Sequence, residues 1–343
     1  MKQVVIEERL RESEVHPPEI FRKIRESSVE SAAMLLEKGE GFEETACPAC
    51  GGEAREEAFS KHGYRWWVCA ACATLYVSPR PDERGMAWYL HASPAAHFRK
   101  SAAYEREMRP FFEEVSHHRA AWIEDLWWRA DLPKAAPLLL FEPKHRALTE
   151  ALRRRTGGEL LLFRPLYATQ EERERGITRS WEGGRGITPI ENLSGREIGG
   201  VVAFDVMEHL CRPEAFLRAS HEALRPGGLL CLSMRCGSGF DIQVLWEHST
   251  LFPLEHLNLL SVEGGRRLVE GGGFEVMEIS TPGQLDVEIV ARTAREEGVA
   301  IPRFLRYFLE HRSPEARAQL QAFLQKHLLS SHLRIVARKR KEA

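Results

Sequence analysis

Short apolar runs separated by amphipathic stretches mark the middle of the chain as an alternating α/β unit. Four of these runs have the length and apolar character of buried strands: Leu138–Phe141, Leu160–Phe163, Gly200–Asp205 and Leu229–Met234. Between them lie segments with helical spacing and one weaker apolar run: His145–Arg155, Thr169–Arg175, Pro213–Leu224 and, as a weak strand, Ile187–Ile190. Strands and helices that alternate at this spacing predict a parallel sheet with helices on both faces.

The flanking segments divide the chain further. Residues 1–44 are rich in Glu, Arg and Lys, with apolar residues at near-helical spacing, and residues 82–132 carry a helical pattern rich in aromatic residues. The later pattern predicts a helix at Ser261–Glu270, strands at Phe274–Ser280 and Val287–Ala291, and a helical stretch at about 302–328. We therefore expect a helical arm (1–44), a small unit (45–81), a helical bridge (82–132), an α/β domain (133–295) and a C-terminal helical extension with a basic tail (296–343).

Four cysteines dominate the small unit. Cys47 and Cys50 form one CxxC pair, and Cys69 and Cys72 form a second pair after eighteen intervening residues. This spacing suits a hairpin that brings four thiolates to one tetrahedral Zn²⁺, with no position left open for a substrate. Two redox or chance CxxC pairs are the alternative, although a thioredoxin-like motif occurs once and opens a helix. The sequence therefore predicts a structural zinc ribbon.

Composition limits the remaining classes. The 343 residues carry a formal net charge of −2, which argues against a general nucleic-acid or membrane binder. The three other cysteines, an odd number, argue against a disulfide framework and favour a reducing cytoplasm. The chain shows neither a signal-peptide pattern nor an apolar run near the roughly 20 residues that span a bilayer. We expect a soluble cytoplasmic protein.

Two further features have competing interpretations. Trp66 and Trp67 suit either a stacking platform for a nucleobase or, as we favour, packing of the ribbon against its neighbour. The tail Arg338–Lys341 suits either contact with nucleic acid or an acidic partner or, as we favour, a solvated terminus.

The second half of the chain resembles a known family. Its motifs are Val201–Leu210, Pro213, Leu224–Gly228, Gly237–Asp241, Pro253–Asn258, Gly273–Val276 and Thr281–Val287. They resemble class I S-adenosylmethionine-dependent methyltransferases, in particular a bacterial branch that also carries an N-terminal four-cysteine zinc ribbon and is frequent near surface-polysaccharide and sugar-modification genes. The resemblance extends from Cys47 to Ser331–His332. It implies a Rossmann-like methyltransferase domain behind the zinc ribbon and helical bridge, and a sugar or small-metabolite acceptor.

The chain departs from this family at the positions that hold the methyl donor. In the family, the first strand ends in an acidic residue and a Gly-x-Gly-x-Gly loop, whose glycines let the backbone approach the cofactor. Here Leu140 stands at the acidic position, and Glu142, Lys144 and Arg146 stand where the glycines belong. Arg164 replaces the acid that binds the ribose hydroxyls, while Asp205 remains after the fourth strand. These positions of the family pocket are degenerate, so binding of S-adenosylmethionine is in doubt.

Two histidines are the candidate catalytic residues. The resemblance places His209 beside cofactor and acceptor and His256 on a loop that covers the acceptor site, and either imidazole suits a general base. The alternative, which we favour because the donor loop is altered, is that both are packing and loop-anchoring residues. Lys144, Arg146 and Arg164 suit either a new anion site or a set of solvated charges. The stretch Ser330–His332 is assigned no chemistry.

Two functions remain open at this point. The first is a methyltransferase with a weakened donor site; the second is a non-catalytic relative that acts as a binding or scaffold subunit, paired with an active paralogue. The acceptor, the oligomeric state and the pathway are not predicted by the sequence.

Overall fold

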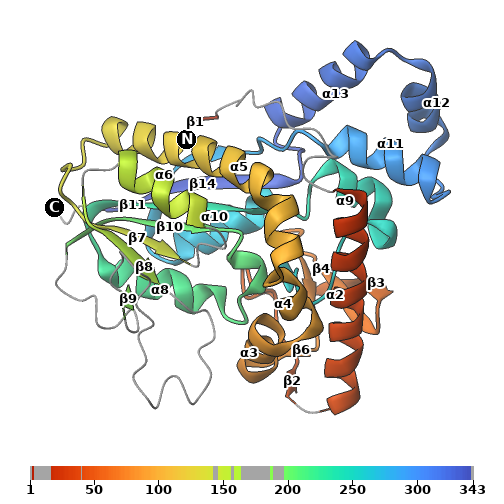
Figure 1. The fold of residues 1–343 in the computed structure, drawn as a ribbon, viewed down its shortest axis with the longest axis horizontal. Coiled ribbons are helices and arrows are strands. Elements are labelled where there is room, and N and C mark those ends of the chain that lie inside the picture. The colour runs from red at the N-terminus through yellow and green to blue at the C-terminus, as the bar shows by residue number, and fades with distance from the viewer. Residues whose placement is uncertain are drawn as a thin grey trace.

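A computed structural model describes residues 2–3, 17–39, 41–141, 146–155, 158–163, 186–187 and 197–340 of the protein. Within these residues the molecule has a large mixed sheet with helices on both faces, a smaller sheet at one end and a helical C-terminal extension (Figure 1).

The main sheet has eight strands among the described residues, in the order β1, β13, β14, β11, β10, β7, β8, β9. Their bounds are β1 Lys2–Gln3, β7 Leu138–Phe141, β8 Leu160–Phe163, β9 Gly186–Ile187, β10 Ile198–Phe204, β11 Leu224–Arg235, β13 Phe274–Ser280 and β14 His332–Lys339. β14 is antiparallel to both of its neighbours, and the other pairs are parallel. Because β7, β8, β9 and β10 run in one direction, their carboxyl ends meet at one edge, where open α/β sheets bind ligands.

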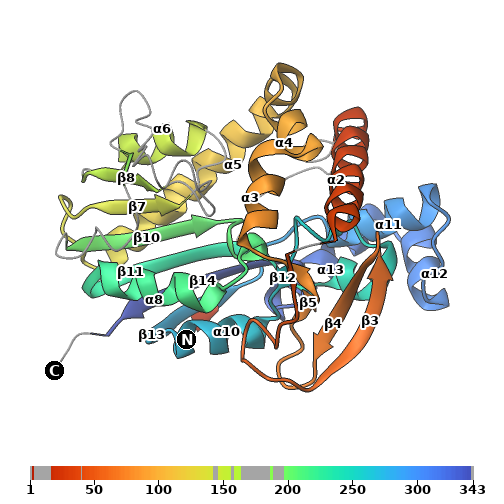
Figure 2. The same cartoon turned by 90° about the horizontal axis from the view of Figure 1, so that it is seen from below.

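Two layers of helices bury the two faces of this sheet. Helices α5 (Ala102–Arg129) and α6 (Arg146–Arg155) cover one face, and α8 (Pro213–Ala223) and α10 (Val262–Gly271) cover the other (Figure 2). The strand residues alternate between the layers: Leu138 and Leu140 pack toward α5 and α6, whereas Leu139 and Phe141 pack toward the opposite core. This explains why the strands are apolar throughout and not alternating.

The cysteine-rich unit forms the second sheet. Its strands are β3 (Arg55–Lys61), β4 (Tyr64–Cys69), β5 (Leu75–Val77) and, from far along the chain, β12 (Asn258–Leu259), in the order β12, β5, β4, β3. A separate pair joins β2 (Phe42–Glu43) to β6 (Arg80–Pro81). Helix α2 (Pro18–Lys38) packs on this sheet, and α3 (Glu83–Ala92) and α4 (Pro94–Arg99) lead into α5. The unit at 45–81 is therefore not self-contained, because its sheet includes a strand of the α/β domain.

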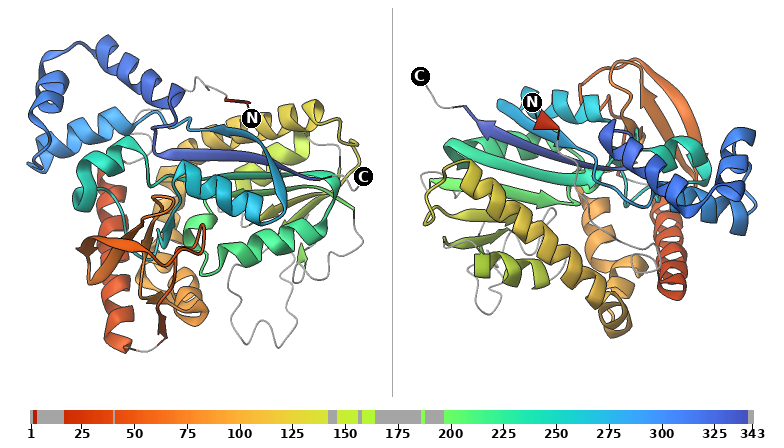
Figure 3. Two further views of the ribbon diagram at one scale, coloured as in Figure 1. Left: turned by 180° about the vertical axis from the view of Figure 1, so that it is seen from behind. Right: turned by 90° about the horizontal axis from the view of Figure 1, so that it is seen from above.

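The remaining elements follow β11, except for η2, which lies between β10 and α8. They are α9 (Phe240–Leu245), α11 (Asp286–Glu296), α12 (Arg303–His311), α13 (Pro314–Lys326) and two 3₁₀ turns, η2 (Met207–His209) and η3 (Trp246–His248). Helices α11 to α13 share a satellite core with α9 and extend beside the main sheet, whereas β14 returns into its middle (Figure 3). In the part of the chain described here, none of the helices combines the length and apolar character needed to cross a lipid bilayer.

The α/β prediction is confirmed; one predicted strand is wrong, and two other local predictions differ from the structure in part. Val287–Ala291 is not a strand: it lies in α11, because Asp286, Val287, Ile289, Val290 and Thr293 have the spacing of one buried helical face. The predicted helix over Pro213–Leu224 ends at Ala223, and β11 already begins at Leu224, before Pro226–Gly228. The basic tail is not wholly solvated, because Lys339 ends β14 and its Nζ donates to the carbonyl oxygens of His221 (2.7 Å) and Leu224 (2.8 Å).

The structure leaves some predictions open and decides others. The predicted helix Thr169–Arg175 and residues 188–190 lie outside the described residues. Trp66 is fully buried, which favours packing over a stacking platform. Trp67 is half-buried beneath the Arg55 guanidinium, 4.2 Å from its ring centroid.

Candidate functional site: a four-cysteine cluster and a polar pocket at the sheet edge

The four cysteines converge on one point. The Sγ atoms of Cys47, Cys50, Cys69 and Cys72 all lie within 4.8 Å of one another. Sγ of Cys47 is 3.5 Å from that of Cys72, and Sγ of Cys50 is 3.6 Å from that of Cys69. Four sulfurs with Zn–S bonds of about 2.3 Å stand roughly 3.8 Å apart around a tetrahedral ion, so the donor set fits zinc.

Local backbone geometry explains the convergence. Each CxxC pair lies in a tight turn, closed by Gly51 N to Cys47 O (2.9 Å) in the first and by Ala73 N to Cys69 O (2.9 Å) in the second. Both turns end in a left-handed residue, Gly51 at φ 71° and Ala73 at φ 57°. The hydrogen bond between Cys47 and Cys72 raises the pKa of Cys47 and lowers that of Cys72 to about 4. The lowered pKa of Cys72 favours its thiolate, which is the form that binds metal.

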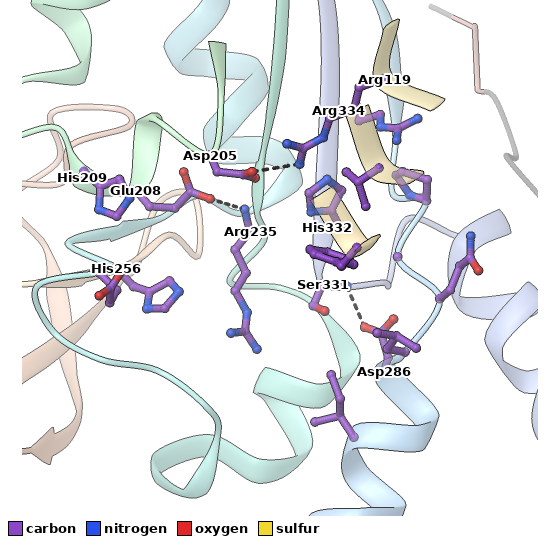
Figure 4. Close-up of a pocket in the computed structure, with 18 residues that line it drawn as sticks. Arg119, Asp205, Glu208, His209, Arg235, His256, Asp286, Ser331, His332 and Arg334 are labelled. Atoms are coloured by element: carbon purple, nitrogen blue, oxygen red, sulfur yellow. Dashed lines mark hydrogen bonds and ion pairs between the residues drawn. The ribbon is translucent and has the colours of Figure 1, made fainter. Parts of the chain in front are cut away.

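A pocket of about 320 Å³ opens at the edge of the main sheet (Figure 4). It is bounded by the ends of β10 and β11, the start of β14, helix α5, the amino end of α11 and the loop before β12. Its polar lining residues are Arg119, Asp205, Glu208, His209, Arg235, Glu255, His256, Gln284, Asp286, Ser331, His332 and Arg334. Both histidines chosen from the sequence, and Asp205, therefore line one pocket.

Asp205 lies in the turn that ends β10. Its φ is 55°, a left-handed conformation, and its amide donates to the carbonyl oxygen of Ser233 (2.7 Å) on β11. Its Oδ2 accepts from Nη2 of Arg119 on α5 at 2.9 Å. Asp205 therefore faces the pocket, but a cation from the bridge helix already contacts its carboxylate.

The turn η2 carries Glu208 and His209, both buried. Oε1 of Glu208 accepts from the backbone N–H of Arg235 at 2.6 Å, which fixes η2 to the end of β11. The Arg235 guanidinium in turn donates to Asp241 (2.9 Å) and to Oγ1 of Thr250 (3.0 Å). The glutamate of this Glu-His pair thus has an anchoring contact.

His256 lies opposite, in the loop that precedes β12. Its Nδ1 is 3.2 Å from the backbone nitrogen of Phe252. Burial, followed by the charge of Arg235, lowers the pKa of His256 well below its usual value. The imidazole is therefore neutral at pH 7 and able to accept a proton.

Glu255, next to His256, is held by the helical bridge. It accepts hydrogen bonds from the Tyr89 hydroxyl and the Arg99 guanidinium. Burial alone raises the pKa of this carboxyl, but the Arg99 charge and the His209 ring outweigh it and bring the pKa to about 2. Glu255 is therefore ionised across the physiological range.

Sequence reasoning missed the opposite wall of the pocket. His332 contacts Oγ of Ser233 through Nε2 (2.8 Å), and burial lowers its pKa to about 3. Asp286 accepts from Ser330 Oγ (2.5 Å), Ser331 N (2.7 Å) and Gln321 Nε2 (2.8 Å), while burial raises its pKa. The adjacent polar run Ser330–His332 in front of an apolar strand was the available signal.

The proposed donor positions are described only in part. Leu140, at the position of the family's acid, is fully buried among the α5–α6 core residues. Glu142, Lys144 and Arg164 lie outside the described residues, as does the side chain of Arg146, the first residue of α6. The alternative anion site at these positions stays a prediction.

Residues 168–279 match the model of a family described as a methyltransferase domain. The match includes β10, η2, β11 and the loop of His256, and it begins after β7 and α6. This part of the chain is a methyltransferase domain. Numbered along the chain without β1, the seven described strands lie across the main sheet in the order 3-2-1-4-5-7-6, and strand 7 (β14) is the one antiparallel to its neighbours. This arrangement agrees with a Rossmann-like methyltransferase fold.

The domain also resembles solved structures, at low identity. A geranyl diphosphate methyltransferase in complex with SAM is 13% identical with a TM-score of 0.41, over 70% of this chain and 92% of the other. A coclaurine N-methyltransferase bound to N-methylheliamine and SAH is 16% identical with a TM-score of 0.36, over 65% and 70%. The cyclopropane synthase MmaA2 from Mycobacterium tuberculosis is 14% identical with a TM-score of 0.35, over 60% and 78%. No curated protein sequence matches the chain.

Proposed function

We propose that this protein is a methyltransferase for a small polar acceptor of the sugar type, and that its donor site binds S-adenosylmethionine weakly. The observation that carries the proposal is the pocket itself, in which a partly buried neutral imidazole (His256), an ionised carboxylate (Glu255) and the η2 turn surround one cavity. These are the groups that a base-assisted transfer requires.

The pocket suits a hydroxyl-rich molecule. Its volume of about 320 Å³ lies at the small end of ligand pockets. Its polar lining pairs donors with acceptors, such as the Arg119 guanidinium with Asp205 and the Arg235 amide with Glu208, so no single charge sign dominates it. Apolar side chains, among them Phe111, Val115 and Leu285, line the rest of the cavity. A polyol presents the same pairing of donors with acceptors, because each hydroxyl both donates and accepts.

The chain's own part in the reaction is positioning and proton transfer. His256 is placed to accept the proton that leaves an acceptor hydroxyl; its lowered pKa leaves it unprotonated at pH 7 and also makes it a weaker base than an ordinary histidine. Glu255 lies beside it as a fixed negative charge and stabilises the imidazolium that forms. S-adenosylmethionine, when bound, would supply the methyl group.

The described residues fit that cofactor only in part. Asp205 lines the pocket, but the buried Leu140 replaces an acid and cannot accept a hydrogen bond. The acid-to-arginine change at Arg164 forfeits about 3 kcal/mol over two ribose hydroxyls. The side chains of Glu142, Lys144 and Arg146 add steric overlap with the cofactor, and the carboxylate of Glu142 repels the carboxylate of S-adenosylmethionine. A total of about 5 kcal/mol corresponds to between three and four powers of ten in affinity, which moves a micromolar dissociation constant to the millimolar range.

The test is methyl transfer at millimolar donor. Purified protein is incubated with labelled S-adenosylmethionine at a few millimolar, roughly the dissociation constant expected for this donor. Each reaction also contains one acceptor from a panel of free sugars, sugar phosphates and nucleotide sugars. We expect label in at least one acceptor, and a loss of about 10²- to 10⁴-fold in His256→Gln. Transfer that is unchanged in His256→Gln contradicts the proposed base.

A second candidate is a non-catalytic scaffold subunit that works with an active paralogue. It is favoured by the four altered donor positions, Glu142, Lys144, Arg146 and Arg164. If the panel shows no transfer while one member still binds to the wild type and not to Arg235→Ala, the pocket is a binding site only. This outcome selects the second candidate.

We further propose that the cluster of four cysteines binds one structural zinc ion. Its thiols must stay reduced, which is consistent with a cytoplasmic location.

A further inference from the structure

The zinc-ribbon unit, all of whose residues the structure describes, does not line the acceptor pocket itself, but it is hydrogen-bonded to the loop of His256, which does. Strand β12 begins two residues after His256 and pairs with β5, in the register Asn258 with Tyr76 and Leu259 with Leu75 (Figure 2). Val77 N also donates to the carbonyl oxygen of Leu257 at 3.0 Å. The loop that bears His256 therefore leads directly into β12, the edge strand of the ribbon sheet.

The metal knuckle touches the same segment. Ser261 Oγ donates to the carbonyl oxygen of Cys72, and Ser261 N donates to Thr74 Oγ1 at 3.4 Å. Thr74 also contacts the cluster, because Sγ of Cys72 lies 3.3 Å from its Oγ1. Only a few residues of chain separate His256 from a residue bonded to a cysteine turn.

One buried amide joins this segment to the other histidine. Asn258 is 1% exposed, and its Nδ2 donates to the carbonyl oxygens of Met207 (3.0 Å) and Leu210 (2.6 Å), which flank His209 in η2. Its Oδ1 accepts from Nη1 of Arg80 at 2.7 Å. Arg80, at the end of the ribbon, also donates to the carbonyl oxygen of Cys211 just beyond η2. The carbonyl groups of Met207 and Leu210, on either side of His209, thus both accept hydrogen bonds from Asn258, whose side chain is in turn held by Arg80 of the ribbon.

We propose that the metal-loaded ribbon positions both pocket histidines, and that Arg80 and Asn258 are the positioning residues that connect it to them. The physical reason is that β5, β12 and η2 form one hydrogen-bonded chain, so loss of order in the cysteine turns removes the partner of β12 and the anchor of Asn258 together. The inference rests on the proposed function only in naming the cavity as the acceptor pocket.

Metal removal is the first test, and it needs neither donor nor acceptor. Hydrogen exchange of the full chain is compared with zinc bound and after chelation. We expect exchange at least about tenfold faster in peptides spanning 206–211 and 252–261, while strands β7 and β10 keep their protection. Unchanged exchange in the two histidine peptides, while peptides of 45–77 lose protection, overturns the proposal.

Substitution is the second test. Asn258→Ala and Arg80→Lys are compared with Arg65→Ala, a matched change at an exposed arginine of the neighbouring strand β4. We expect the first two to shift the imidazole proton resonances of both His209 and His256 and to speed exchange in the same peptides, and Arg65→Ala to do neither. Arg80→Lys keeps the charge and loses the two-pronged contact, so it remains informative if Asn258→Ala fails to fold.

Imidazole resonances that stay at wild-type positions in folded Arg80→Lys, with zinc bound, contradict the proposal. These readouts also separate it from the proposed function. A protein that transfers no methyl group but shows the coupled exchange supports the inference alone.

Discussion

The partly buried contact between Arg99 and Glu255 gives a stability prediction with a defined size. Arg99 is the last residue of α4 and Glu255 lies in the pocket wall, so their ion pair joins the helical bridge to the loop of His256. The side chains are 30% and 13% exposed. We consider the change Arg99→Met, which keeps the length of the side chain and removes its charge.

The magnitude follows from the pKa of Glu255. A carboxyl whose pKa falls from 4.5 to about 2 on folding contributes about 3 kcal/mol of stability. This contribution is fully present above pH 4.5 and is lost as the pH falls toward 2, because protonation then favours the unfolded chain. Without Arg99 the buried carboxylate has lost its main counter-charge, a change that costs about 3–5 kcal/mol in other buried pairs. The partial exposure of Arg99 favours the lower end of that range.

The assay is denaturant unfolding of the wild type, Arg99→Met, Glu255→Gln and the double variant, at pH 7 and pH 4. We expect Arg99→Met to lose about 3 kcal/mol at pH 7 and less at pH 4, and to lose much less in the Glu255→Gln background. The control is Arg106→Met, whose pair with Glu107 is 72% and 48% exposed, so its loss is expected to stay below about 0.5 kcal/mol.

Two results would refute this reasoning. One is a loss at pH 7 no larger than that of Arg106→Met. The other is strict additivity of Arg99→Met and Glu255→Gln, which means that the two groups do not interact.

Three further predictions concern the metal, the imidazole of His332 and the donor site. Cys69→Ser lowers the zinc content, measured by mass spectrometry, and destabilises the amino-terminal unit. The control Cys231→Ser, in the main sheet, leaves the zinc content unchanged. One zinc per chain retained in Cys69→Ser argues against a four-sulfur site. Because burial lowers the pKa of His332 to about 3, the unfolded chain binds a proton between pH 3 and 6.5 that the folded chain does not. The free energy of unfolding therefore rises as the pH increases through this range and falls as the solution is acidified. His332→Gln reduces this slope by about 1.4 kcal/mol per pH unit, a change that denaturant titrations at pH 5 and 6 detect. Restoring Gly at positions 142, 144 and 146 and Asp at position 164 tightens binding of S-adenosylmethionine by about 10³-fold in calorimetry, and an unchanged affinity shows that these positions do not limit it.

The elements that the sequence predicts best are those whose pattern is local. β7, β8, β10 and the cysteine cluster follow from apolar runs and CxxC spacing, which depend on neighbouring residues alone. Val287–Ala291 was mistaken for a strand because its short apolar run fits both periods, and only packing against α9 and α13 selects the helix.

The pocket shows the same division. Asp205, His209 and His256 were identified from motifs and do line one cavity. Arg119, Asp286 and His332 come from a bridge helix, from a helix start and from the C-terminal strand, and no local pattern brings them together. The contribution of β12 to the ribbon sheet was missed for the same reason, since a two-residue strand carries no periodic signal.

Calorimetric titration of the zinc-loaded protein with S-adenosylmethionine tests the central claim most directly. A weakened donor site beside an intact acceptor pocket predicts a dissociation constant in the millimolar range, about three powers of ten above an ordinary site. A low-micromolar dissociation constant would contradict it, because it would mean that the altered loop and Arg164 hold the donor as well as the glycines and acid that they replace.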